Sequence, residues 1–142
     1  MYMRLKIQKY LFDIQTSIYI QKTFNGAFSD TPRGEECTLD LIAETIDNLI
    51  DNNTTLFREI LSNIPEKQKG LLYAIARDGE AEQITAAKFI KRHNLASASS
   101  VQSAISKLLE KDVVTEINKI YSVTDKFFAI WINTIYGKKY TL

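Results

Sequence analysis

Hydrogen-bonding side chains crowd one short stretch of the sequence, residues 97–107, which reads SASSVQSAISK. Val101 and Ile105 recur there at helical spacing, so the polar residues project from the opposite side of a helix. Serine and glutamine side chains can hydrogen-bond base edges in the major groove, and glutamine can do so bidentately to adenine. The stretch therefore predicts a helix that contacts DNA bases. The side chains expected on its exposed face are Ser99, Ser100, Gln102, Ser103, Ser106 and Lys107.

Affinity for duplex DNA comes mainly from lysine and arginine side chains that contact phosphates, and residues 97–107 contain few such side chains. Nearby cations complete the expected DNA-binding set: Lys91 and Arg92 before the helix, and Lys119 in a turn after it. Lys88 is close by in the sequence. The same residues also suit a plain solvated surface or a face that docks on a protein, and both alternatives stay open.

The elements that position these residues follow from periodicity and capping signals. Three helices are expected at residues 65–77, 86–93 and 98–111, the second capped by Thr85 and the third by Ser97. Two β-branched and aromatic strands, 113–117 and 120–123, flank a turn at Asn118 and Lys119, as in a hairpin. Asp125 caps a last helix at 126–136. Helix, helix, helix and hairpin is the order of a winged helix-turn-helix.

The preceding residues predict further helices. One is expected at 5–24, ended by Asn25 and Gly26, which both tolerate positive φ. Thr38 caps another at 39–51, and a short helix runs from Thr54 or Thr55 to about residue 61. The expected fold class is mainly α: a helical, lid-like or interaction segment at 1–64, then a winged helix-turn-helix with a small β-hairpin wing at 65–142.

Composition narrows the function classes. Residues 1–64 carry six Lys/Arg and nine Asp/Glu, whereas residues 65–142 carry twelve and eight, so the second half is mildly basic. Cys37 and His93 are the single cysteine and histidine, which argues against a disulfide or a metal site and favours a reducing, cytoplasmic location. No phosphate loop or catalytic set of side chains occurs. We expect a protein without catalysis, cofactor, metal or membrane contact.

Three runs together resemble a known family: LSNIPEKQKGLLYAIARDG, NLASASSVQSAISKLLEKDVV and YSVTDKFFAIWI. They are similar to the C-terminal region of archaeal-type P-loop ATPases of the AAA/STAND group. There a helical lid and a winged helix follow the nucleotide-binding core, and the winged helix closes with a motif like Tyr-x-Val-x-Asp-x-Phe-Phe-x-x-Trp. That motif corresponds here to Tyr121, Val123, Asp125, Phe127, Phe128 and Trp131.

The resemblance implies a regulatory module, because the family's ATP-binding core is not in this sequence. The leading hypothesis is a non-catalytic, DNA-binding winged helix from the C-terminal part of an AAA/STAND-type ATPase. Its expected partners are double-stranded DNA and the ATPase core or another protein. The alternatives are a winged helix that docks on protein without DNA, and a free-standing transcriptional regulator whose N-terminal helices dimerise or sense a ligand.

Overall fold

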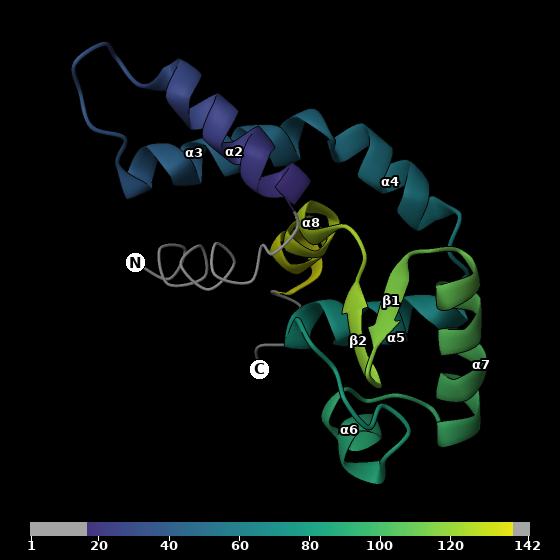
Figure 1. The fold of residues 1–142 in the computed structure, drawn as a ribbon. Coiled ribbons are helices and arrows are strands. Elements are labelled where there is room, and N and C mark those ends of the chain that lie inside the picture. The colour runs from purple at the N-terminus through teal and green to yellow at the C-terminus, as the bar shows by residue number, and fades with distance from the viewer. Residues whose placement is uncertain (1–16, 138–142) are drawn as a thin grey trace. The chain divides into compact units, whose positions relative to one another are not determined.

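The structure is a computed structural model that describes residues 17–137 (Figure 1). Its elements are α2 (Ser17–Asp30), α3 (Leu39–Asn52), α4 (Thr54–Ser62), α5 (Glu66–Asp78), α6 (Ala87–Arg92), α7 (Ala98–Glu110), β1 (Val114–Ile117), β2 (Ile120–Val123) and α8 (Lys126–Tyr136). The chain divides into two compact units between Asn53 and Thr54. Within residues 17–137, no helix has the length and apolar character needed to cross a membrane.

Over residues 17–53, the first unit contains two packed helices, α2 and α3. Thr38 caps α3 as expected, since its side chain accepts a hydrogen bond from the backbone N–H of Leu41 at 3.2 Å. Ile46 and Ile50 of α3 are buried, as is Ala27 of α2. Burial of one stripe from each helix therefore holds the pair together.

Helix α2 departs from the prediction, because it continues through Asn25 and Gly26 to Asp30. Gly26 of α2 lies directly against α3: a Cβ there would be 2.5 Å from Cγ2 of Thr45. The absent side chain allows close packing, and this tertiary contact outweighs the local tendency of Asn-Gly to end a helix. Residues 5–16 of the predicted helix lie outside the described residues.

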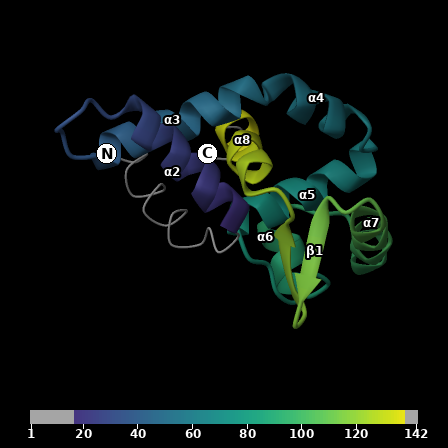
Figure 2. The same ribbon diagram turned by 45° about the horizontal axis from the view of Figure 1, so that its top comes forward.

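The second unit is built around α5, against which α7, α8 and β2 all pack (Figures 1 and 2). Leu72 and Ile75 of α5 and Leu108 of α7 are fully buried. On α7 the predicted burial of Val101 and Ile105 is confirmed, and Ala104 is buried with them. Leu109 is half-buried.

The wing, strands β1 and β2, is an antiparallel hairpin whose register runs from Val114 opposite Val123 to Ile117 opposite Ile120. Asn118 and Lys119 connect the strands with φ of 53° and 65°. Two successive left-handed residues form the hairpin turn that matches the twist of the strands. Helices α5, α6 and α7 followed by this hairpin confirm the expected fold class, mainly α with a winged helix-turn-helix.

Two features of the second unit differ from the expectation or extend it. Thr85 does not cap α6: the N-cap position is Ala86, whose N–H donates to the carbonyl of Gln83 in a preceding turn. Ala81, before that turn, pairs with Tyr121 through two backbone hydrogen bonds of 2.8 and 2.9 Å. This single-residue bridge gives β2 a partner on its second edge.

Helix α4 belongs to the second compact unit, which begins at Thr54. Its Phe57 is 2% exposed, and the ring lies 5.4 Å from that of Phe128 and 5.8 Å from that of Trp131, centroid to centroid. This aromatic cluster ties α4 to α8, because the three rings pack against one another.

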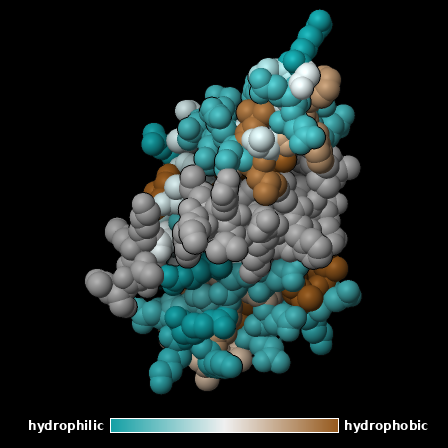
Figure 3. Space-filling view, turned by 90° about the vertical axis from the view of Figure 1, so that its left-hand side faces the viewer, coloured by the Kyte–Doolittle hydropathy of each residue, from teal (hydrophilic) through white to brown (hydrophobic). Residues whose placement is uncertain are grey.

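The surface carries a few large exposed apolar side chains among many polar ones. On the face shown in Figure 3, hydrophobic atoms form small groups separated by hydrophilic ones. The most exposed apolar side chains of the described residues are Phe24, Phe28, Leu39, Leu56, Ile117 and Ile135. Scattered side chains of this kind are ordinary for a folded protein, so they carry no functional argument.

Phe57→Ala tests whether α4 is part of the winged-helix core. Loss of the ring leaves a cavity beside Phe128 and Trp131, so the free energy of unfolding should fall by about 3–5 kcal/mol. Trp131 is the only tryptophan, and its fluorescence during denaturant unfolding reports this transition directly. Leu56→Ala is the matched control, because Leu56 is half exposed and its loss should cost far less. Equal effects of both substitutions would exclude α4 from the core.

Gly26→Ala tests the helix crossing in the first unit. In an isolated helix this change stabilises by about 1 kcal/mol, but here the new methyl group meets Thr45. We expect faster hydrogen exchange of the backbone amides in α2 and α3, measured by mass spectrometry. Asn25→Ala, at an adjacent exposed position, should leave exchange unchanged or slow it. Slower exchange in Gly26→Ala would refute the close crossing.

Candidate nucleic-acid interface

Helix α7 begins with a complete capping box. The side chain of Ser97 accepts from the N–H of Ser100, and the side chain of Ser100 accepts from the N–H of Ser97, both at 3.2 Å. The Ser99 and Ser97 hydroxyls also lie 3.1 Å apart. Ser99 and Ser100, predicted to contact bases, are therefore engaged in fixing the first turn of the helix.

The exposed face of α7 is uncharged and polar over its first half. Val101, Ala104 and Ile105 are buried, whereas Gln102, Ser103 and Ser106 are exposed. Residues at these spacings lie on one side of a helix, as the sequence indicated. We define the polar face of α7 as Ser99, Gln102, Ser103 and Ser106.

The cations at the end of α7 have local partners. Nζ of Lys107 lies 2.8 Å from a carboxylate oxygen of Glu110, and both side chains are exposed. The hydrogen bond from Lys107, followed by its charge, lowers the pKa of Glu110. Nζ of Lys111 donates to the carbonyl of Asn63 at 3.1 Å. Lys107 is accessible, but Glu110 offsets much of its charge.

Asp78, at the end of α5, holds the end of α6. Its Oδ2 accepts from Arg92 and lies 3.1 Å from Nε2 of His93. The His93 side chain is 4% exposed, whereas that of Arg92 is 54% exposed. Sequence reasoning missed Asp78, because a pair separated by 14 or 15 residues in different helices leaves no periodic signal.

Exposed cations lie on α6 and on the wing, the elements that precede and follow α7 in the chain. Lys88 and Lys91 are exposed on α6, and Lys119 is exposed in the turn of the wing. Within residues 17–137, neither Lys91 nor Lys119 forms an ion pair. In Figure 1, the turn of the wing, α6 and the first turn of α7 lie toward the same end of the second unit. These elements can present their cations to one extended polyanion.

The wing carries an acidic group as well as Lys119. Glu116 lies opposite Tyr121 in the register of the hairpin. Burial raises the pKa of Tyr121, and the charge and hydrogen bond of Glu116 raise it further. Because Glu116 would repel phosphate, Lys119 is the phosphate ligand that the wing offers.

This fold and its exposed polar helix define a winged helix-turn-helix domain. The chain matches the family model described as "probable winged helix domain" over residues 55–134, and it belongs to that family. No curated protein and no solved structure matches the chain. Winged helix domains often bind DNA and are typically non-catalytic.

Ser97→Ala tests the capping box that fixes the start of α7. Loss of the cap leaves the N–H of Ser100 without its acceptor, which should cost about 1 kcal/mol. For a domain of this size, the melting temperature followed by circular dichroism should fall by about 4–8 °C. Ser103→Ala, on the exposed face of the same helix, should leave the melting temperature nearly unchanged. Indistinguishable melting of the two variants would show that the cap contributes no stability.

Proposed function

We propose that this domain binds double-stranded DNA with α7 in the major groove. The observation that carries the proposal is the polar face of α7, an uncharged hydrogen-bonding surface on a capped helix, with exposed lysines on α6 and on the wing. Major-groove base edges present donors and acceptors that suit serine and glutamine, and phosphates flank the groove. Gln102 and Ser103, in the first half of the helix, would contact bases.

The proposed DNA contacts are of two kinds, lysine and arginine contacts to phosphates and serine and glutamine contacts to bases. Lys91 before α7 and Lys119 in the wing would bind phosphates on either side of the groove. Lys107 and Arg92 would add weaker contacts, because carboxylates already compete for them. Ser99 and Ser106 are base contacts at the borders of the polar face, and Ser100 acts by holding the helix start in place.

We further propose that the module is the C-terminal regulatory part of an AAA/STAND-type ATPase in the cytoplasm. Support comes from the motif running from Tyr121 to Trp131, whose apolar members Val123, Phe127, Phe128 and Trp131 are all buried. The resemblance thus lies in residues that build the core and is independent of the surface that would meet DNA. The single, exposed Cys37 suits a reducing compartment.

The proposal is tested by fluorescence anisotropy of a labelled random-sequence duplex titrated with the protein at low and near-physiological salt. Phosphate contacts release counterions, so binding should weaken steeply as salt rises. Absence of binding at low salt would overturn the proposal and leave α7 and the wing as a protein-docking surface.

Lys91→Gln with Lys119→Gly tests the two flanking contacts. Glycine suits the positive φ of position 119, so the turn of the wing is kept while the charge is removed. Loss of two phosphate contacts should weaken binding at low salt by at least about tenfold and reduce the slope of log K against log salt by about 1.8.

The matched control is Lys22→Gln with Arg58→Gln, which removes the same charge from exposed positions on α2 and α4. Its affinity and salt slope should stay close to those of the unmodified protein. If both double variants lose affinity equally, net charge alone explains the binding, and the assignment of Lys91 and Lys119 is wrong.

A further inference from the structure

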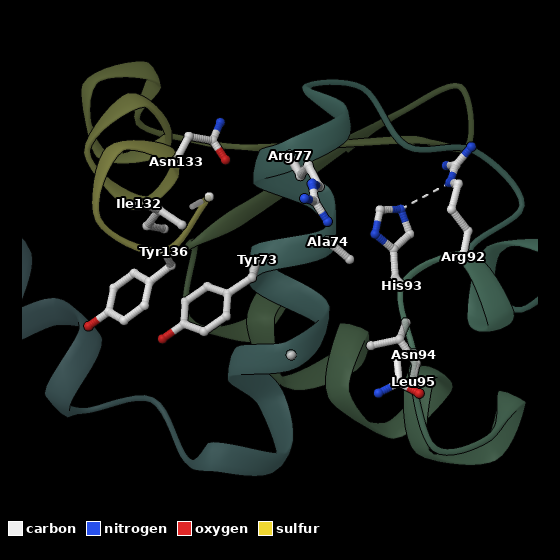
Figure 4. A pocket seen from close by; sticks show the side chains of 12 residues that line it. Tyr73, Ala74, Arg77, Arg92, His93, Asn94, Leu95, Ile132, Asn133 and Tyr136 are labelled. Carbon is white, nitrogen blue, oxygen red and sulfur yellow. Dashed lines mark hydrogen bonds between the residues drawn. The ribbon is translucent and has the colours of Figure 1, made fainter. Parts of the chain in front are cut away.

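A cavity of about 210 Å³ lies in the second unit, away from the polar face of α7 (Figure 4). Three parts of the chain enclose it: the second half of α5, the turn between α6 and α7, and the end of α8. Neither periodicity nor any motif signals it, because its walls come from segments about 20 to 60 residues apart. Its principal side chains are Tyr73, Arg77, Arg92, His93, Asn133 and Tyr136.

One wall of the cavity is aromatic. The rings of Tyr73 and Tyr136 are stacked, with centroids 4.8 Å apart and planes inclined by 14°. Figure 4 shows the two rings side by side, joining α5 to the end of α8. Ile132 and Ala74 add apolar surface beside them. Tyrosine rings that line a cavity suit a planar ligand, because ring stacking gains energy with little loss of conformational entropy.

The other wall is cationic. Arg77 and Arg92 line it, and no acidic side chain is among the described residues that line the cavity. Figure 4 shows Arg77 between the tyrosine side of the cavity and His93, whose Nε2 lies 3.2 Å from Nε of Arg92. Asp78, which does not line the cavity, is a carboxylate shared by Arg92 and His93. Two guanidinium groups are therefore among the residues that line the cavity.

Size and chemistry together limit the ligand. Apolar cavities of about 150 Å³ hold a benzene-sized molecule, so about 210 Å³ accommodates one ring with a small substituent. Guanidinium groups bind carboxylates bidentately. We propose that the cavity binds a small planar carboxylate, a monocyclic aromatic acid or a molecule of that form, with its ring on the tyrosines and its carboxylate on Arg77 and Arg92.

The cavity shares only Arg92 with the proposed DNA contacts, and its test uses no DNA. The full chain, labelled with ¹⁵N, is titrated with benzoate and followed by two-dimensional NMR. Benzamide keeps the ring and removes the charge, whereas acetate keeps the charge and removes the ring. Benzoate should give saturable shifts confined to the residues around the cavity, with at least about tenfold tighter binding than either analogue.

Arg77→Gln should weaken benzoate binding at least about tenfold, because it removes a charge-assisted hydrogen bond. Arg58→Gln, an exposed arginine of α4 outside the cavity, is the matched control and should bind as the unmodified protein does. Each variant's own spectrum reports whether it is folded, and Tyr136→Leu provides a second variant that removes half of the aromatic wall. Absence of saturable shifts, or equal binding by Arg77→Gln and Arg58→Gln, would overturn the proposal.

Discussion

Burial of α5 on most of its sides is the constraint on which the rest of the second unit depends. Leu71, Leu72, Ala74, Ile75 and Ala76 are all buried, so this helix needs neighbours around it rather than on one face. Helices α7 and α8 and strand β2 supply them. Packing against one shared helix fixes these three elements relative to each other, and it thereby fixes which side of α7 stays exposed.

Most of this arrangement could be predicted from the sequence because its signals are local. The apolar stripe of α7 lies within one helix, and its spacing also dictates which serines face solvent. Thr38, Ser97 and Asp125 cap helices through residues three positions away, and each cap is present in the structure. The turn at Asn118 is a two-residue signal of the same kind.

The features that escaped prediction depend on contacts distant in sequence. Helix α2 continues through Gly26 because of Thr45, and α4 joins the second unit because Phe57 meets Phe128 and Trp131. Ala81 pairs with Tyr121 through an isolated β-bridge, and a single residue cannot show the alternating pattern that predicts a strand. In the candidate interface, the exposure of the polar face could be predicted, but the pairing of Arg92 with Asp78 could not.

Arg92 and His93 share Asp78, yet the two pairs differ in how easily they break. His93 is nearly inaccessible, so separating it from Asp78 would strand a buried polar group. Arg92 is half exposed, and an ion pair at such a position contributes little stability because water screens it. His93 therefore keeps Asp78 in place while Arg92 can exchange its partner at small cost. Since Arg92 lies both on the edge of the cavity and beside Lys91, a carboxylate in the cavity and a DNA phosphate would compete for the same guanidinium group.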